Sequence, residues 1–170
     1  MRSVLPAAAL VVLGLAAPAF ADDCAAIVSA SIKQSNTPYS GNMTITQAGG
    51  QPMQGKTVYM LTKLYTQVNG KWSVMPINSQ QLAQQIQASM KNGSMSCKKA
   101  GQESVGGEAA TIYTAHDAQQ DGSSVDTKSW ISNSRNLPLK SEAHINTNPG
   151  SQAISMTFNY SNVTAPAGVK

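Results

Sequence analysis

Residues 152–161, Gln-Ala-Ile-Ser-Met-Thr-Phe-Asn-Tyr-Ser, carry the clearest structural signal in the chain. Ile154, Met156, Phe158 and Tyr160 recur at every second position, with small or polar residues between them. Successive side chains of a β-strand point to opposite faces of the sheet, so this alternation predicts a strand with one apolar face.

The sequence upstream of this stretch, from Cys97 onward, has the pattern of strands alone. Asp121-Gly122, Asn136-Leu137-Pro138 and Asn148-Pro149-Gly150 are turn sequences that interrupt the apolar runs at short intervals. Tight turns of this kind join antiparallel neighbours. The C-terminal part therefore predicts a β-meander of five strands over 102–105, 108–116, 125–133, 139–146 and 152–161.

The N-terminal part of the sequence adds a helix and a further strand. Ala25, Val28 and Ile32 lie at spacings of three and four, which predicts a short amphipathic helix over 24–33. Apolar and polar residues alternate over 39–47, which predicts a strand. Residues 56–68 carry apolar side chains on both parities, so we expect one long strand that is covered on both sides.

A hairpin and a second helix follow. Asn69-Gly70 favours a type I′ turn, because both of its central residues need a positive φ. It joins the preceding strand to another over 71–75. A helix is predicted from Ser79 to the Asn92-Gly93 pair, with Leu82, Ile86 and Met90 on one face and mostly Gln on the other. The order is α-β-β-β-α followed by the meander.

The first 21 residues have the layout of a cleavable signal peptide. Arg2 precedes an apolar run over 4–20 that ends in Ala19-Phe20-Ala21, the small-x-small pattern of a signal peptidase site. The alternative is an uncleaved membrane anchor, which needs about 20 apolar residues. We expect cleavage before Asp22, export to the periplasm, and a single domain over 22–170.

Cys24 and Cys97 are the two cysteines of the chain, and an even number in an exported protein predicts a disulfide. Closing so long a loop would stabilise the fold by up to about 4.5 kcal/mol in the chain-entropy model. The alternative is a reactive thiol, but the sequence has no C-x-x-C motif to support redox chemistry.

The charge pattern argues against nucleic-acid binding. Only 12% of residues are charged, and Lys98-Lys99 is the one adjacent pair of cations after Arg2 is removed. Tracking a phosphate backbone requires clustered Lys and Arg. We therefore expect no nucleic-acid partner.

The sequence offers little for catalysis. His116 and His144 are the only histidines, and neither lies at a metal-ligand spacing. His116-Asp117 could be half of a catalytic triad, but adjacent strand residues face opposite ways and no G-x-S-x-G motif supplies a nucleophile. We predict a protein that is not an enzyme and has no metal and no cofactor.

Methionine is frequent in the predicted mature chain, at seven positions. Met43, Met60 and Met156 fall on apolar strand faces. They either fill a core or line an adaptable cavity, because flexible thioethers accommodate varied apolar groups. The residues alone favour core packing.

The C-terminal strands resemble those of a known family. The matching stretches are Ser129-Trp130-Ile131-Ser132, then Asn136-Leu137-Pro138-Leu139-Lys140 with Glu142, and the run from Met156 to Val163. They are similar to the W-I/V, "lPlk.e" and "f.Y.nv" motifs of the bacterial lipoprotein-carrier superfamily, the LolA/LolB-like proteins. The resemblance covers about the last 40 residues, and most of the rest of the chain matches only in topology. The chain also has fewer aromatic residues on its strands than the well-known carrier.

The resemblance implies an α+β fold in which a curved antiparallel sheet of about seven to eight strands forms an unclosed half-barrel under two or so helices. It also implies an apolar cavity for lipid or lipoprotein acyl chains, and an envelope membrane or lipoprotein partner. The strand parity that faces inward stays open. Candidate lining residues are Val58, Met60, Leu64, Leu82, Ile86, Met90, Ile112, Trp130, Ile154, Met156 and Phe158.

Two other functions remain open at this stage. One is an envelope structural or protein-interaction module with a filled core and no ligand. The other is a small hydrolase, for which the sequence supplies His116 as its one candidate base.

Overall fold

The computed structural model describes residues 20–91, 95–119, 121–147 and 150–169. Residues 1–19 of the predicted signal peptide lie outside this range. None of the described helices is long and apolar enough to cross a membrane. The elements are α1 (Phe20–Ser35), β1 (Tyr39–Gln47), β2 (Met53–Tyr59), β3 (Lys63–Val68), β4 (Lys71–Pro76), α2 (Ser79–Lys91), β5 (Met95–Val105), β6 (Glu108–Ala118), β7 (Ser124–Ser132), β8 (Pro138–Thr147) and β9 (Gly150–Asn159).

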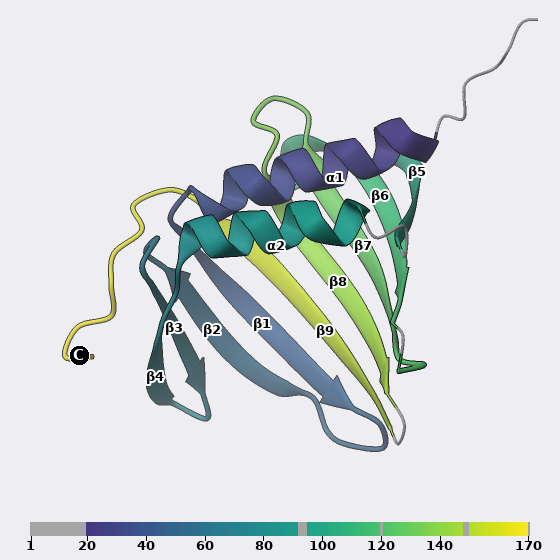
Figure 1. Ribbon diagram of the computed structural model, residues 1–170. Helices are drawn as coiled ribbons and strands as arrows, with labels where there is room; N and C mark the ends of the chain where they lie inside the picture. The colour runs from purple at the N-terminus through teal and green to yellow at the C-terminus, as the bar shows by residue number, and fades with distance from the viewer. Residues whose placement is uncertain (1–19, 92–94, 120, 148–149, 170) are drawn as a thin grey trace, which may run out of the picture.

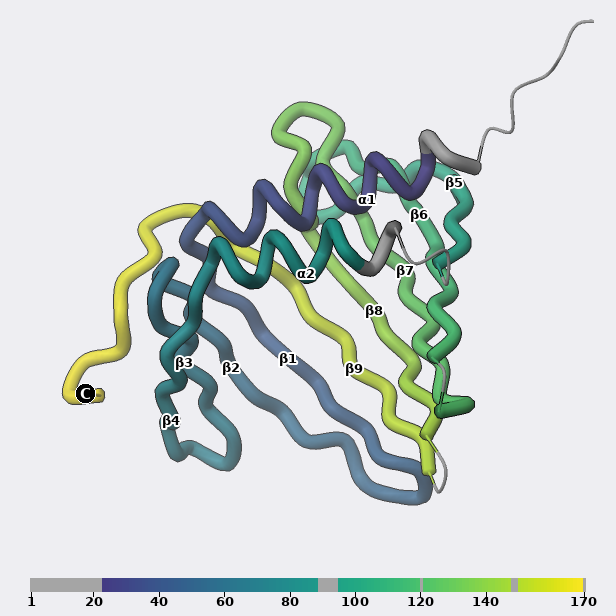
Figure 2. The backbone as a smooth tube through the Cα atoms, in the orientation of Figure 1, coloured from purple at the N-terminus to yellow at the C-terminus, as the bar shows by residue number. Residues whose placement is uncertain are grey.

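The strands form one antiparallel sheet in the order β4-β3-β2-β1-β9-β8-β7-β6-β5. Its two edges, β4 and β5, are not paired with each other, so the barrel stays open. The sheet curves, and α1 and α2 lie side by side across its hollow (Figures 1 and 2). This confirms the unclosed half-barrel of the α+β class, with nine strands where seven to eight were expected.

The additional strand comes from residues 56–68, which were expected to be one strand covered on both sides. They form β2 and β3, joined by a tight turn in which the Met60 amide donates to the Lys63 carbonyl over 2.9 Å. Leu61 sits in this turn at φ 62. The prediction of one strand is wrong because the chain reverses there, and apolar residues on both parities did not reveal the reversal.

Two other local signals are confirmed, whereas β5 (Met95–Val105) begins well before the strand predicted over 102–105. Asn69 and Gly70 have φ values of 51 and 77, as a type I′ turn requires. Helix α2 begins at Ser79, and the Asn78 side chain caps it by accepting a hydrogen bond from the Gln81 amide at 3.0 Å. Helix α1 is longer at both ends than the predicted 24–33.

A disulfide defines which face of the sheet carries the helices. Cys24 of α1 is bonded to Cys97 of β5, with their Cα atoms 5.1 Å apart. Residues directly opposite one another on antiparallel strands share a face, and Cys97 is in register with Ala115, then Thr127. We call this face, under the helices, the inner face, and the opposite one the outer face.

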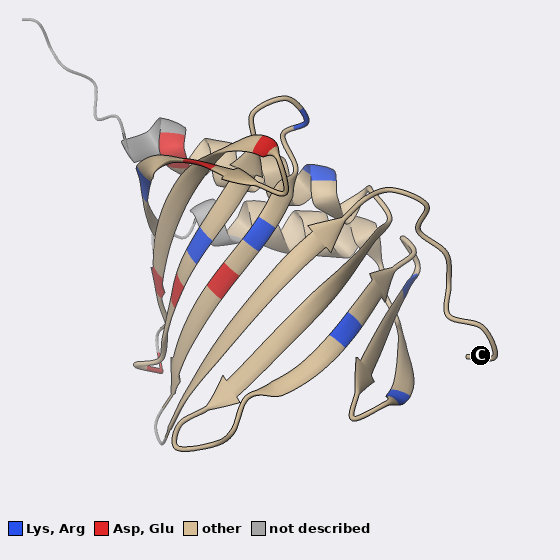
Figure 3. Cartoon of the chain, turned by 180° about the vertical axis from the view of Figure 1, so that it is seen from behind, with Lys and Arg blue, Asp and Glu red and all other residues tan. Residues whose placement is uncertain are grey.

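The outer face has a small core of its own, made by Ala110, Ile112, Trp130 and Leu139. Trp130 is only 2% exposed, and its indole N–H donates to Glu103 at 2.8 Å. The end of the β5–β6 hairpin bends across this face (Figure 3). Trp130 therefore stabilises the outside of the half-barrel rather than its hollow.

Candidate functional site

Two adjoining pockets lie between the helices and the inner face of the sheet. The central pocket has a volume of about 340 Å³ and the side pocket about 260 Å³. Ser31 and Gln34 of α1 and Ile86 of α2 line both of them. The central pocket falls within the range of roughly 300–1,000 Å³ that is typical of ligand sites.

The central pocket is lined by apolar side chains with polar ones between them. Ile27 and Val28 project from α1, Ile86 from α2, and Phe158 from β9. Uncharged Ser, Thr and Gln side chains and one carboxylate, that of Asp117, complete the wall. The remaining lining residues are Ser31, Gln34, Met95, Ala115, Val125, Thr127, Ser129, Pro138 and Ser141.

The side pocket lies against a cluster of aromatic rings. Tyr39 stacks on Tyr59 with ring centroids 5.2 Å apart and meets the edge of Phe158 at 5.3 Å. Burial, followed by the neighbouring Tyr59, raises the pKa of Tyr39 to about 12. The phenols are neutral at physiological pH, so the wall presents rings and hydroxyls without charge. Ser35, Leu64, Ile77 and Leu82 also line this pocket, beside the shared residues.

The rings have room to cluster because Gly41 lies opposite Phe158 in the β1–β9 register. A Cβ at Gly41 would fall 2.5 Å from the carbonyl oxygen of Thr157. A side chain at this position would therefore push β1 and β9 apart beneath the pockets. A glycine is therefore required at this position of β1 by close backbone approach.

The C-terminal half of α1 is fixed to the sheet by hydrogen bonds around these pockets. The Tyr59 hydroxyl donates to the Ser35 carbonyl at 2.7 Å. The Gln34 amide donates to the Tyr160 hydroxyl at 3.1 Å, and that hydroxyl donates to the Pro138 carbonyl at 2.6 Å. Burial raises the pKa of Tyr160, which keeps it a donor. Gln34 is thereby held in place on the wall of both pockets.

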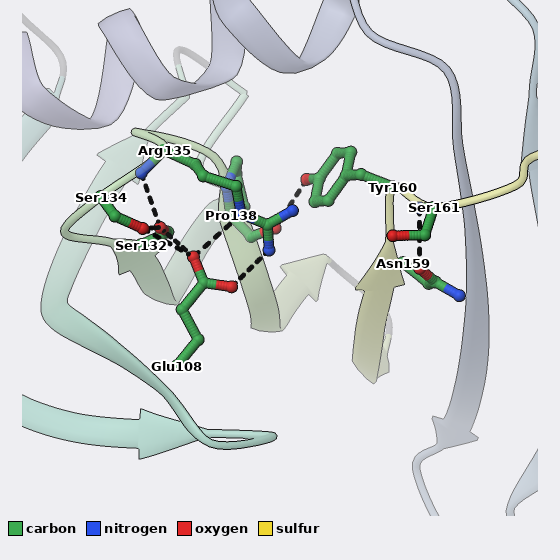
Figure 4. Close-up of polar contacts among 8 residues, drawn as sticks. All are labelled: Glu108, Ser132, Ser134, Arg135, Pro138, Asn159, Tyr160 and Ser161. Atoms are coloured by element: carbon green, nitrogen blue, oxygen red, sulfur yellow. Dashed lines mark hydrogen bonds and ion pairs between the residues drawn. The ribbon is translucent and has the colours of Figure 1, made fainter.

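A charged cluster supports the same end of α1 from the loop between β7 and β8 (Figure 4). Arg135 donates through Nε to Glu108 at 2.9 Å, and Ser132 and Ser134 also donate to this carboxylate. These bonds, that of Arg135 first, lower the pKa of Glu108 to about 2. Arg135 also lies 5.4 Å from the centre of the Tyr160 ring. The cluster is structural in character, since Arg135, Ser132 and Ser134 all donate to the one carboxylate of Glu108.

The predicted lining residues separate into three groups. Ile86, Leu64, Leu82 and Phe158 line the two pockets. Ile154 and Met156 share the inner face but lie outside both lining sets, and Met156 is in register with Met43. Met60 lies in the β2–β3 turn, and the side chain of Met90 lies outside the described residues.

The third group, Val58, Ile112 and Trp130, faces outward. Ile112 and Trp130 are three residues from Ala115 and Thr127 of the inner face, and strand alternation turns them away from the helices. On β2, Met53 stands opposite Ile45 of the inner face, and Thr57 points to the same side as Met53. Val58 is the next residue after Thr57, so its side chain points to the outer face. These three side chains do not line the space under the helices, because alternation alone could not reveal which parity faces inward.

A polar row crosses the outer face. Ser96, His116, Asp126 and His144 stand opposite one another on β5 to β8. His116 Nδ1 lies 2.7 Å from Asp126 Oδ1, and both side chains are about half exposed, at 51% and 52%. His116 thus has Asp126, not its neighbour Asp117, as its partner. In the described parts of the chain, no group of three or more His, Cys, Asp or Glu is placed to hold a metal ion.

Sequence reasoning missed several residues that line the pockets. Ser31 and Gln34 are polar and carried no apolar signal, although their spacing of three places them on one face of α1. Tyr39 and Tyr59 were assigned to strands but not to the site. Asp117 was considered only as a partner of His116. Because adjacent strand residues point to opposite faces, the sequence already indicated that Asp117 and His116 lie on different faces of the sheet.

Comparisons with known proteins identify the fold. Neither protein-family models nor curated protein sequences match the chain. The chain is similar in structure to MucB, with a TM-score of 0.54, 13% identity, and coverage of 91% of this chain and 64% of MucB. The MucA/MucB complex of Pseudomonas aeruginosa gives 0.53 and 12%, covering 88% and 60%. Lipoprotein LppX of Mycobacterium tuberculosis gives 0.48 and 13%, covering 88% and 99%.

At these identities the likeness to MucB shows the fold alone, and the chain spans less than two thirds of the MucB chain. The fold expected from the sequence resemblance is confirmed at this level. The structure also confirms the predicted Cys24–Cys97 disulfide, a feature that fits an exported protein.

Proposed function

We propose that this protein is a non-catalytic binding protein of the periplasm, which holds an apolar ligand such as a lipid or a lipoprotein acyl chain under its two helices. The observation that carries the proposal is the pair of adjoining pockets, walled by Ile27, Val28, Ile86, Leu82 and Phe158. An acyl chain needs a dry apolar surface and no reactive group.

A groove on the outer face of the sheet has a volume of about 500 Å³, but it suits this role less well. Its lining includes His116, Asp126, Lys128 and Glu142. Charged side chains lose favourable hydration when an apolar molecule covers them. The helix-covered pockets are therefore the better site for an acyl chain.

The direct test is native mass spectrometry of the mature protein purified from a bacterial periplasm, followed by organic extraction. We expect a mass above that of the chain alone and an extractable lipid or acylated peptide. A mass equal to the bare chain, unchanged after incubation with dodecanol and other single-chain amphiphiles, would contradict the proposal and favour a filled core.

A matched pair of variants locates the ligand. Ser31→Phe places a ring where both pockets meet, whereas Ala25→Phe places the same ring on the exposed side of α1. The proposal expects Ser31→Phe to lose the bound mass and Ala25→Phe to keep it. Retention by both variants would place the ligand elsewhere.

Binding of a protein partner is the second candidate, because MucB, whose fold this chain shares, has been solved in complex with MucA. In that case native mass spectrometry would show an added mass equal to that of a polypeptide, and organic extraction would not remove it. The hydrolase alternative is tested separately: cleavage of simple esters that is abolished by His116→Ala would support it, and unchanged hydrolysis would remove its only base.

A further inference from the structure

Asp117 is the one charged residue among the described residues that line the central pocket. It lies near the end of β6 on the inner face, in register with Met95 on one side and Val125 on the other. Both neighbours are apolar and line the same pocket. A carboxylate between two apolar side chains has no evident packing role there.

One oxygen of this carboxylate is unpaired. Asp117 Oδ2 accepts a hydrogen bond from the Gln119 side chain at 2.8 Å. Asp117 Oδ1 is buried, and among the described residues it is the only buried side-chain oxygen or nitrogen without a hydrogen-bond partner. An unpaired buried acceptor destabilises the folded state, so folded proteins retain few of them. A ligand that donates to this oxygen would remove that destabilisation.

The charge of the pocket restricts the ligand further. The other described lining residues are apolar or uncharged, so the pocket carries a negative formal charge from Asp117. A carboxylate or phosphate head beside Asp117 would be repelled, whereas an ammonium head would gain a charge-assisted hydrogen bond. Ile86 and Phe158 offer apolar contacts for the rest of such a ligand.

We propose that the ligand is a single-chain amphiphile whose polar end is a cationic N–H donor bound to Asp117. The inference rests on the proposed function and specifies its ligand class. The apolar chain lies between Ile86 and Phe158, under the helices. Asp117 is then a specificity residue, which selects an amine head over an acidic one.

The test compares three probes with the same chain: dodecylamine, dodecanol and dodecanoic acid. Each is titrated at neutral pH into the oxidised mature protein by isothermal calorimetry, below its aggregation concentration. We expect dodecylamine to bind at least about tenfold more tightly than dodecanoic acid, as a charge-assisted hydrogen bond implies. Dodecanol should lie between them.

Two variants with the same charge change separate the pocket from the surface. Asp117→Asn removes the charge at the pocket, and Asp126→Asn removes one from the outer face, where Asp126 is 52% exposed. We expect Asp117→Asn to lose the preference for dodecylamine and still bind dodecanol, while Asp126→Asn keeps the preference. Thermal unfolding of both variants checks that each is folded.

The outcomes separate the two proposals. Equal binding of all three probes by the wild type, or the same preference in Asp117→Asn, would overturn the assignment of Asp117 and leave the apolar site intact. Binding of none of the probes would overturn the proposed function, and the ligand class with it. The wild-type comparison needs no variant to fold.

Discussion

The two helices over the half-barrel differ in how they are held. Helix α1 is tied to the sheet by the Cys24–Cys97 disulfide, by the Lys99 amide bound to Asp23 at 2.8 Å, and by hydrogen bonds at its C-terminal end. Among the described residues, α2 has a cap at Asn78, whose side chain accepts a hydrogen bond from the Gln81 amide. Its other attachment is an apolar stripe with Leu82 and Ile86.

This difference indicates a division of roles. Helix α1 forms a fixed wall of both pockets, and α2 closes them mainly through side chains that would also contact an apolar ligand. Local stability is lowest where few buried contacts hold an element. We therefore expect α2 to open more easily than α1 and to gain most from a ligand.

The largest effect is expected from the disulfide. Replacing both cysteines, Cys24→Ser with Cys97→Ser, should lower the free energy of unfolding by about 2–5 kcal/mol, because the unfolded chain regains the freedom of a long loop. Urea unfolding of the variant measures this loss. The reduced wild type is the control and should match the variant; a free energy of unfolding equal to that of the oxidised wild type would contradict the role given to the bond.

Removing the Glu108 carboxylate should have a smaller effect that depends on pH. The folded protein holds the pKa of Glu108 at about 2, below the ordinary value of 4.5. This carboxylate therefore stabilises the fold above pH 4.5 and loses its contribution as the pH falls toward 2. Glu108→Gln should cost about 1–2 kcal/mol at pH 7 and little at pH 2.

The measurement is urea unfolding at several pH values between 2 and 7. Glu142→Gln is the control, since Glu142 pairs with Lys140 on the outer face and lies away from Arg135. The control should keep the steeper pH dependence of the wild type. Parallel pH curves for the wild type and Glu108→Gln would contradict the assignment.

A truncation on α2 should affect ligand binding more than stability. Ile86→Ala should cost only about 1 kcal/mol, because a half-buried side chain loses less than a fully buried one. It should weaken binding of dodecanol several-fold, since Ile86 lines both pockets. Gln85→Ala, on the exposed side of α2, is the control; equal binding by the two variants would place the ligand away from α2.

The smallest effect is expected at the α2 cap. Asn78→Ala removes the acceptor of the Gln81 amide and should cost about 0.5–1 kcal/mol. The loss should appear as faster hydrogen exchange over α2, with α1 unchanged. A uniform increase over both helices would show that they open together.

Most of the fold could be predicted from local sequence signals. The alternation at 152–161 and the Asn69-Gly70 turn each depend on a few neighbouring residues, and both are confirmed. The reversal at Leu61 could not be predicted, because Leu rarely takes a positive φ and the tertiary structure imposes it there. Propensity gives little warning of a turn without Gly, Asn or Pro.

The site was less predictable than the fold. The stripe with Leu82 and Ile86 on α2 could be read from helical spacing. Which alternate residues of each strand face inward could not be read from the sequence, since Trp130 and Phe158 are both large and apolar yet face opposite sides of the sheet. The Cys24–Cys97 disulfide, which joins α1 to one face of β5, decides between them. Asp117 is assigned to the ligand site because its buried Oδ1 has no hydrogen-bond partner among the described residues, and the sequence cannot show that.

Hydrogen exchange of the oxidised mature protein, measured with and without dodecylamine, tests most directly whether a ligand binds between a fixed α1 and a looser α2. We predict slow exchange over 24–35 in both states, and exchange over 79–88 that is fast without the amine and slow with it. Equal protection of the two helices without the amine, or no change over 79–88 on adding it at a concentration that saturates calorimetric binding, would contradict this account.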